Sequence, residues 1–439
     1  MPAQIVEPPF QSASGLERYL SEQRSPAQAR LGLPTEFVLP HYDLSIANVP
    51  GTLAALLGGG LDGAAPPLPD AMWADLATAV HRVVWIILDA VGWLRLRQMV
   101  QDEHDLTFAR LAQGGRLVPI TSVFPSTTTS ALPTLWTGYA PAQHGLVGHN
   151  LYLRDFGLVV DTLGFSPTGQ PRRDQMVEQG MIPEEFLPVP GLAETLAKQG
   201  IVTRTLIRRR LADSALSRLC FRGAAEVKGF ITAADMWVCL RELLAAHLDE
   251  RLLLVAYWAK VDTISHHRGP DSRSWRAELR NLAFSLEREF LRDLSQAERK
   301  GTLLVITADH GQIAGTTESS ILLSEHPVLQ DCLLLPPTGG PRSSYLFARQ
   351  GQVEAARRYL HDHLAEQFAV VDSAAALAAG LLGPGRPAAE SPCRLGDLAV
   401  LARGDYMLDY KEREEPLLGL HGGLSPWEML VPLLMARLD

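Results

Sequence analysis

Acidic and imidazole side chains follow three strongly apolar segments of this sequence. The segments 83–88, 252–258 and 302–307 have the continuous apolar composition of strands that are buried on both faces. The polar residues that follow these segments, or that precede the similar segment 429–435, are Asp89, Asp262, His266, Asp309, His310 and His421. Carboxylates and imidazoles without a thiolate suit Zn²⁺ at hydrolytic sites and suit Mn²⁺ nearly as well. The pattern therefore predicts a site for divalent cations.

A run of hydroxyl residues, 126–129, is the second feature that could do chemistry. Apolar and β-branched residues at 120–124 precede Pro125, which we expect to end a strand. Helical spacing then resumes at 132–136. A hydroxyl at such a strand-to-helix turn lies where backbone N–H groups and the helix dipole favour an anion, so it could attack phosphorus. The alternative is that these residues only cap the helix, since Ser and Thr are favoured there.

Each acid or histidine also has a purely structural interpretation. Asp89 and Asp309 could each cap a helix. His266 could form a solvated pair with His267, and His421 could lie in a turn. Taken singly, these interpretations are at least as good as a metal role. Taken together, so many acids and histidines at strand ends beside a hydroxyl turn favour a common site.

The elements that must position these side chains are those of an α/β protein with a mostly parallel central sheet. Open sheets of this kind bind ligands at the carboxyl ends of the strands, where residues far apart in sequence meet. Asp262 and His266 are four residues apart, so one helical turn would place both on one face. Helices are expected at 93–103, 191–200, 233–247 and 275–294.

The length of 439 residues suits one large domain with insertions, or two domains. We divide the chain into an N-terminal extension packed on the core, 1–80, a catalytic core, 81–311 with 421–439, and a small inserted α/β lobe, 312–420. Residues 151–190 carry many Pro and Gly, so we expect loops over the active face.

Charge and hydropathy argue against two classes of partner. The net charge of -9 argues against a general nucleic-acid binding surface. The basic run 208–210 is local, and we interpret it as the solvated edge of a strand at 201–207, with a grip on phosphate as the less favoured alternative. The longest apolar stretches are far shorter than the ~18 residues that span a bilayer, so no membrane partner is expected.

The 4 cysteines lie scattered, without the spacing of a metal site or a disulfide framework. The first residues lack the basic and apolar segments of a signal peptide. We therefore expect reduced thiols in a cytoplasmic protein.

The order of these motifs resembles the alkaline phosphatase superfamily, and most of all its type I phosphodiesterase and nucleotide pyrophosphatase branch. Phe-Pro-Ser-Thr-Thr at 124–128, Leu-Trp-Thr-Gly at 135–138 and His-Gly at 144–145 are similar to the nucleophile segment of that branch at matching spacing. The later motifs are Asp-x-x-x-His at 262–266 with its HRGP tail, Asp-His-Gly at 309–311 and His-Gly at 421–422. The closing segment HGGLSPWEMLVPLL also resembles PglZ-type domains of the same superfamily. The resemblance covers the chain from about residue 83 to the C-terminus.

This resemblance implies a fold and a set of roles. The fold is an alkaline-phosphatase-like three-layer sandwich with a mostly parallel central sheet and a small inserted α/β lobe. Thr128 takes the place of the nucleophile. Asp262, His266 and His421 would bind one metal ion, and Asp89, Asp309 and His310 would bind a second that is shared with Thr128. The oxyanion-binding Asn of the branch falls on His149 in an ungapped count, with Asn150 beside it, and either residue could be that donor.

Two departures from the branch bear on the substrate. The branch has an aromatic residue after the nucleophile that stacks on a nucleobase, and here that position is Thr129. An arginine that matches one for binding a phosphomonoester dianion is not evident, which favours diesters.

The implied activity is metal-dependent hydrolysis of a small-molecule phosphate ester, most closely that of a phosphodiesterase or nucleotide pyrophosphatase. Two divalent cations ~4 Å apart, Zn²⁺ or else Mn²⁺, would activate Thr128 and stabilise the leaving oxygen. A phospho-threonine would form and then be hydrolysed. The alternatives are phosphomonoesterase, phosphonate hydrolase or phosphomutase chemistry of the same superfamily, and, from another class, a non-catalytic PglZ-like metal-binding module. A sulfatase is disfavoured, because no Cys/Ser-x-Pro-x-Arg segment lies near Thr128.

Overall fold

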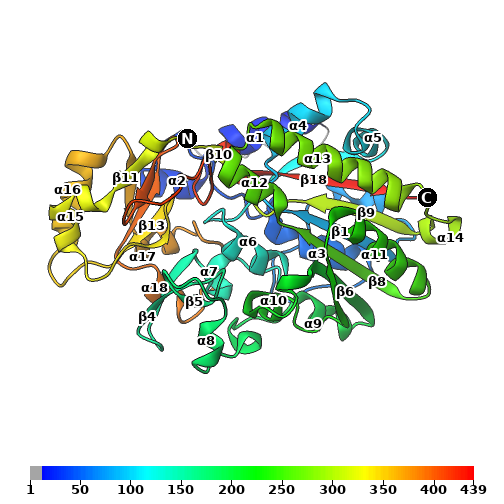
Figure 1. Ribbon diagram of the computed structural model, residues 1–439, viewed down its shortest axis with the longest axis horizontal. Helices are drawn as coiled ribbons and strands as arrows, with labels where there is room; N and C mark the ends of the chain where they lie inside the picture. Colours follow the sequence, from blue (N-terminus) through cyan, green and yellow to red (C-terminus); the bar gives the residue numbers. More distant parts are fainter. Residues whose placement is uncertain (1–11) are drawn as a thin grey trace.

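The computed structural model describes residues 12–439 and contains two seven-stranded sheets with the helices that cover them (Figure 1). The central sheet has the strand order β2 (Arg116–Thr121), β18 (Leu430–Arg437), β9 (Thr302–Thr307), β1 (Arg82–Leu88), β8 (Arg251–Trp258), β6 (Ile201–Arg208) and β7 (Glu226–Phe230). β18 runs antiparallel to both of its neighbours, and the remaining strands are parallel to one another. The prediction of an α/β fold with a mostly parallel central sheet is confirmed.

The strands that carry the site are those with continuous apolar sequences. β1, β8 and β9 lie side by side, with Ile87 opposite Tyr257 on one side and Thr307 on the other. All seven residues of β1 and all six of β9 are buried. Because these strands are parallel and in register, the residues that follow them leave the sheet at one edge.

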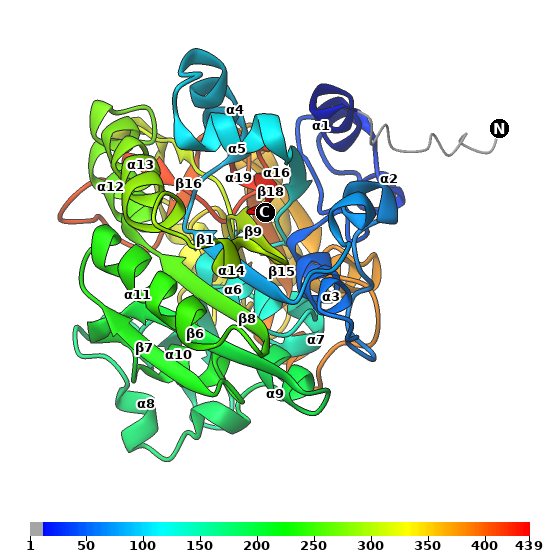
Figure 2. The ribbon, with the colours of Figure 1, turned by 90° about the vertical axis from the view of Figure 1, so that its right-hand side faces the viewer.

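Helices cover both faces of the central sheet (Figures 1 and 2). One layer holds the mutually packed helices α4 (Trp93–Asp102), α5 (Thr107–Gly114), α11 (Ala233–Ala246) and α13 (Arg273–Ser285). The other layer includes α3 (Val49–Leu56), α6 (Thr128–Leu135), α9 (Leu192–Ala197) and α10 (Ala215–Cys220). The helix expected at 275–294 is α13 followed by a π-helical segment, Leu286–Leu291.

The smaller part of the molecule, at the left of Figure 1, is built around the second sheet. Its strand order is β14 (Phe368–Asp372), β15 (Leu398–Ala402), β13 (Ser343–Leu346), β12 (Thr338–Gly340), β3 (Asn150–Leu153), β4 (Leu158–Asp161) and β5 (Ser166–Pro167). The helices α15 (Pro327–Cys332) and α16 (Val353–Leu364) belong to a separate small hydrophobic core on this side.

The expectation that 151–190 would be loops is wrong for its first part, because β3, β4 and β5 lie there. Leu151, Leu153 and Val160 are buried although Pro and Gly are frequent nearby, since those residues serve the tight turns between short strands. The second sheet therefore joins strands from this segment to strands from 338–402. The division of the chain into extension, core and lobe stays a prediction.

The N-terminal part of the described chain packs on the central sheet. Leu16 and Leu20 of α1 (Ala13–Glu22) are buried, and α1 lies against β2. Residues 1–11 of the expected extension lie outside the described residues. β2 ends at Thr121 rather than at Pro125, so the sequence-based end of this strand is wrong by several residues. Among residues 12–439, no helix has both the length and the apolar composition that crossing a membrane requires.

Candidate active site

The carboxyl edge of the central sheet brings the predicted acids and histidines together. Asp89 directly follows β1, and Asp309 and His310 come just after β9. Asp262 and His266 lie one turn apart on α12 (Lys260–Arg268), which begins just after β8. His421 precedes β18, and because β18 is antiparallel, its beginning lies at the edge where the parallel strands end.

Asp262 is the centre of the first group of side chains. His266 Nε2 lies 3.1 Å and His421 Nε2 lies 3.8 Å from Asp262 Oδ1. The three side chains could hold one metal ion between them.

His310 is the centre of the second group. Its Nε2 atom lies 3.6 Å from Asp89 Oδ1, 3.5 Å from Asp309 Oδ2 and 3.1 Å from Thr128 Oγ1. Asp89, Asp262 and His310 also form a possible metal-holding group, so Asp262 lies within reach of both positions. The imidazole rings of His310 and His421 stack with their centroids 4.0 Å apart, which brings the two groups side by side.

Thr128 is the first residue of α6, and its hydroxyl faces His310. The neighbouring Thr127 stands at the N-cap without a side-chain capping bond, so the hydroxyl run does not act as an ordinary cap here. Ser126 Oγ donates to the carbonyl of Gly423 at 2.7 Å, which ties the hydroxyl turn to the loop that carries His421. Thr128 is buried at 8 % exposure, and it lines a cleft together with Asp89 and Asp262.

Buried polar atoms without partners show that the site fits cations. In the described part of the chain, Asp89 Oδ1, Asp309 Oδ2 and His421 Nδ1 are buried and have no hydrogen-bond partner. An unpaired buried carboxylate oxygen is costly, whereas a metal ion would satisfy it. The donor set is made of carboxylate oxygens and imidazole nitrogens, which matches Zn²⁺ or Mn²⁺ at hydrolytic sites.

Two of the histidines are oriented by backbone carbonyls. His266 Nδ1 donates to the Gly419 carbonyl at 2.7 Å, and His310 Nδ1 donates to the Gly311 carbonyl at 3.0 Å. A carbonyl only accepts, so the proton must be on Nδ1 and the lone pair of Nε2 is free to face the site. This arrangement is typical of metal-binding histidines.

The electrostatics of the group reflect three carboxylates held close together. Burial and the nearby charges of Asp309 and Asp262 raise the pKa of Asp89 well above its ordinary value. Burial also raises the pKa of Asp309, although His310 and backbone N–H groups oppose the shift. At Asp262, burial is outweighed by His266, His421 and His310, which lower its pKa. A divalent cation beside Asp89 and Asp309 would favour their ionised forms, because it supplies the missing positive charge.

His149 and Asn150 line a second cleft next to the first group, together with His266 and His421. Their own contacts are with the second sheet. His149 Nε2 lies 3.4 Å from Asp161 Oδ1, and Asn150 Oδ1 accepts from Thr168 Oγ1 at 3.4 Å. Within residues 12–439, neither side chain shares a hydrogen bond with Thr128. The role of these two residues as oxyanion donors stays a prediction.

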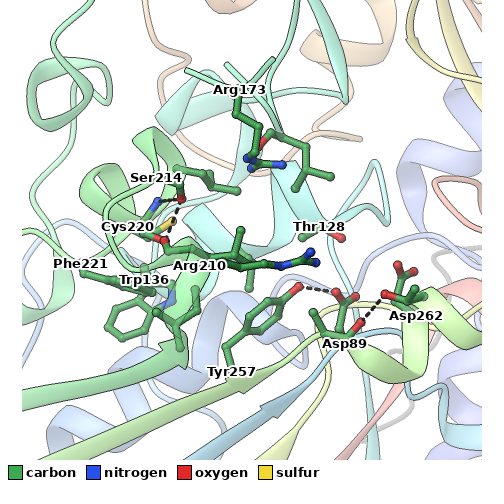
Figure 3. Close-up of a pocket in the computed structure, with 18 residues that line it drawn as sticks. Asp89, Thr128, Trp136, Arg173, Arg210, Ser214, Cys220, Phe221, Tyr257 and Asp262 are labelled. Atoms are coloured by element: carbon green, nitrogen blue, oxygen red, sulfur yellow. Dashed lines mark hydrogen bonds between the residues drawn. The ribbon is translucent and has the colours of Figure 1, made fainter. Parts of the chain in front are cut away.

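Three further side chains of the site were not assigned to it from the sequence. The Tyr257 hydroxyl donates to Asp89 Oδ2, and Gln312 Nε2 donates to Asp262 Oδ1 at 2.6 Å. Arg210 lines the cleft beside Thr128 and Asp89, where Figure 3 shows its guanidinium directed towards them. Two of them had a sequence signal: Gln312 lies two residues after His310, and Arg210 belongs to the basic run 208–210, for which a grip on phosphate was the less favoured alternative. Tyr257 has no such signal, because its position fits the pattern of any buried strand.

Comparison with protein families gives one match over most of the chain. Residues 83–424 match the model of the type I phosphodiesterase / nucleotide pyrophosphatase family. This region contains all the predicted metal ligands and Thr128. No curated protein matches the chain in sequence.

Solved structures of low sequence identity share the fold. Murine ectonucleotide pyrophosphatase/phosphodiesterase 5 superposes with a TM-score of 0.61 at 16% identity, over 80% of this chain and 87% of that chain. An inactive variant of that murine protein, in complex with AMP, matches equally well. Phosphonoacetate hydrolase from Sinorhizobium meliloti 1021, in complex with phosphonoformate, gives a TM-score of 0.58 at 17% identity, over 81% of this chain and 89% of that chain.

Proposed function

The chain belongs to the type I phosphodiesterase / nucleotide pyrophosphatase family, and on that premise we propose that it hydrolyses phosphate esters by attack of Thr128. Members of this family are hydrolases of phosphate ester bonds, and this chain is an enzyme of that class. The observation that carries the proposal is the position of the Thr128 hydroxyl. It lies at the N-terminus of α6, 3.1 Å from His310 Nε2 and in one cleft with Asp89 and Asp262.

The proposed reaction has two displacements at phosphorus. Thr128 Oγ1 attacks phosphorus and gives its proton to solvent, the bond from phosphorus to the leaving oxygen breaks, and the leaving group departs while the phosphoryl group is held as a threonine ester. Water then cleaves that ester and restores the hydroxyl. The free N–H groups in the first turn of α6 favour the negative charge that the phosphoryl group brings to Thr128. His149 and Asn150, across the neighbouring cleft, are the proposed donors to a phosphoryl oxygen.

Two divalent cations are the proposed cofactors, with Zn²⁺ first and Mn²⁺ second. Asp262, His266 and His421 would hold one, and Asp89, Asp309 and His310 with Thr128 would hold the other. When bound, these ions would lower the pKa of the threonine hydroxyl and balance charge on the leaving oxygen. Without them a threonine hydroxyl is too weak a nucleophile at neutral pH.

The proposed substrates are small molecules with a phosphodiester or pyrophosphate bond, as the family description supports. A phosphonate hydrolase is the second candidate, because the phosphonoacetate hydrolase from Sinorhizobium meliloti 1021 has the same fold. Phosphomonoesterase or phosphomutase activity and a non-catalytic metal-binding module remain the further alternatives. The 4 free cysteines of the described chain, three of them buried, support the proposal of a cytoplasmic location.

The test is a turnover assay on the metal-loaded protein with p-nitrophenyl esters, diesters, phosphonates and a nucleoside pyrophosphate. Thr128→Ala should abolish turnover and keep the bound metal, whereas Asp309→Ala should lose both. Thr129→Ala is the matched control, because Thr129 is the next residue, is fully buried and has no partner for its hydroxyl among residues 12–439. Full activity of Thr128→Ala would rule out this nucleophile. Inactivity of the metal-loaded protein on every ester would instead support the non-catalytic module.

A further inference from the structure

The cleft that leads away from Thr128 combines an apolar wall with two cationic side chains. Its apolar wall includes Leu132, Trp136, Leu211, Leu216 and Phe221. Arg173 and Arg210 line the same cleft, which ends at Asp89, Thr128 and Asp262. A substituent of the substrate that enters this cleft would therefore meet both apolar surface and positive charge.

The two arginines approach the cleft from different elements. Arg210 lies in the short 3-10 turn Arg209–Leu211 that directly follows β6. Arg173 lies in the segment between β5 and α8 (Gln175–Glu178). Figure 3 shows Arg210 crossing the cleft towards Thr128 and Asp89, with Arg173 entering from the top of the view. A group bound at Thr128 would thus have one guanidinium in front of it and a second further out.

Neither guanidinium has an anionic partner in the part of the chain that the structure describes. The nearby Arg172, Arg204 and Arg218 form ion pairs with glutamates, whereas Arg173 and Arg210 form none. Arg173 donates to the backbone carbonyl of Leu163. Burial and the charge of Arg210 lower the pKa of Arg208, so these two positive charges lie close together at the end of β6.

We propose that Arg210, assisted by Arg173, selects esters that carry a second negative charge close to the scissile phosphorus. The inference rests on the proposed function and narrows its substrate class. A diester with neutral substituents has a single negative charge. The N-terminus of α6 and the two proposed cations already balance that charge. A guanidinium recognises carboxylate and phosphoryl oxygens in a planar, two-pronged geometry, so an additional anion is the chemistry that Arg210 fits.

The second charge could come from either of two places on the ester. It could be the second ionised oxygen of a phosphomonoester, or a carboxylate or phosphate on the substituent in the cleft. The sequence motifs contain no arginine that matches one for binding a phosphomonoester dianion. Arg210 could still bind a phosphomonoester, because it approaches Thr128 from the turn after β6 and not from the nucleophile segment. The solvated-edge interpretation of the run 208–210 fits Arg209, which does not line this cleft.

The experiment compares Arg210→Ala, Arg210→Lys and Arg173→Ala with the control Arg209→Ala. Three substrates share the p-nitrophenyl leaving group: p-nitrophenyl phosphate, its methyl diester and its carboxymethyl diester. Arg210→Ala should lower kcat/KM about 10- to 100-fold for a doubly charged ester and much less for the methyl diester, as expected for loss of a charged hydrogen bond. Arg210→Lys should recover part of the loss, Arg173→Ala should have a smaller effect, and Arg209→Ala should change nothing.

The pattern of losses identifies the source of the second charge. A selective loss for p-nitrophenyl phosphate assigns it to the phosphoryl group, and a selective loss for the carboxymethyl diester assigns it to the substituent. Equal effects of Arg210→Ala on all three esters, or equal effects of Arg210→Ala and Arg209→Ala, would overturn the inference.

A binding measurement keeps this inference separate from the proposed function. Calorimetry in the Thr128→Ala background measures the affinity for the same three esters without turnover. Addition of Arg210→Ala should weaken binding of a doubly charged ester and leave that of the methyl diester unchanged; unchanged binding of all three would overturn the inference. A metal-loaded wild-type protein that hydrolyses none of the esters would overturn the proposed function alone.

Discussion

At the scale of the residue, the site depends on neutral donors that hold charged groups in place. Asp89 is buried, and the Tyr257 hydroxyl donates to its Oδ2 atom while Oδ1 has no partner in the described chain. Burial and the adjacent Asp89 charge raise the pKa of Tyr257 well above its ordinary value, so the phenol keeps its proton. Tyr257 is therefore a positioning residue for Asp89.

Tyr257→Phe removes this donor with little change in shape. We expect the affinity for the second cation to fall about tenfold, since partners of metal ligands contribute on that scale. Metal affinity measured by competition with a chelator tests this. Tyr345→Phe is the control, because its hydroxyl is also buried but donates to the Val147 carbonyl at 2.8 Å, away from the site. Equal metal affinities for Tyr257→Phe and wild type would refute the role.

The charged residues of the site could be predicted from the sequence, because residue type and position at the end of an apolar strand are both apparent in the sequence itself. Asp89, Asp309 and His310 follow buried apolar strands, and the structure brings them together. It could not identify Tyr257, which resembles any strand residue. It indicated Arg210 only as part of the basic run 208–210, because the role of Arg210 depends on the direction of a long side chain. Such contacts are set by tertiary packing and not by local pattern.

His144 offers a prediction about pH. It is fully buried; its Nδ1 accepts from the Leu146 N–H at 3.1 Å, and its Nε2 lies 3.0 Å from Thr134 Oγ1. Burial lowers its pKa to about 3. In the unfolded chain this histidine has a pKa of about 6.5, so as the pH falls the unfolded state binds a proton before the folded state does. The contribution of His144 to the free energy of unfolding is therefore fully present above about pH 6.5 and is lost as the pH drops towards 3.

His144→Asn keeps an acceptor for the Leu146 N–H and removes the titrating group. Between pH 7 and pH 5, the free energy of unfolding of the wild type should fall by about 2 kcal/mol more than that of this variant. The difference follows from a loss of about 1.4 kcal/mol for each pH unit below 6.5. Urea unfolding at the two pH values measures the difference. Parallel losses in the two proteins would show that His144 does not contribute to acid sensitivity.

At the scale of the element, close packing of loops at the sheet edge fixes the histidines. Gly311 follows His310, and a Cβ atom there would lie 2.1 Å from the Trp427 carbonyl oxygen. The glycine of the Asp-His-Gly motif is thus required because the loop after β9 passes directly against the segment before β18. Its N–H donates to the Glu428 carbonyl at 2.8 Å, which fixes this approach.

Gly311→Ala should therefore destabilise the fold by about 3 kcal/mol, at the upper end of the cost of overpacking, and should reduce metal content because His310 moves. Unfolding in urea and elemental analysis measure the two effects. Gly114→Ala is the control, since nothing lies within 4 Å of a Cβ at that helical position. A Gly311→Ala protein as stable and metal-rich as the control would contradict the packing argument.

The sequence predicted the long buried elements well and the short ones poorly. The segments 83–88, 252–258 and 302–307 correspond to β1, β8 and β9 within one residue, because burial on both faces leaves a continuous apolar run. β3, β4 and β5 have two to four residues each, and β3 joins them to the rest of the second sheet by pairing with β12, which is distant in sequence. Neither their existence nor their sheet could be predicted from local spacing.

At the scale of the whole molecule, a buried ion pair connects the second sheet to the central one. Arg342 precedes β13, and Glu428 lies just before β18. Both side chains are fully buried, with Nε–Oε1 and Nη2–Oε2 distances of 3.0 and 2.7 Å. Glu428 also accepts from the Gly423 N–H at 2.8 Å, so the pair supports the loop that carries His421.

Arg342→Met leaves Glu428 buried without its cation, which should cost about 3–5 kcal/mol of folding free energy. The double variant Arg342→Met/Glu428→Gln should recover part of that loss, because no uncompensated charge remains. Urea unfolding of both variants measures the effect. A loss of folding free energy below about 1 kcal/mol is typical of an exposed ion pair. Such a result would show that the Arg342–Glu428 pair does not hold the second sheet to the central sheet.

The central claim is that Thr128 becomes covalently esterified during turnover. The most direct measurement is mass spectrometry of peptides from metal-loaded protein that has been quenched in acid while it turns over a hydrolysed ester. The account predicts a phosphorus-containing adduct on the peptide that contains Thr128, present in wild type and Thr129→Ala and absent from Thr128→Ala. Turnover without any such adduct, together with full activity of Thr128→Ala, would contradict it.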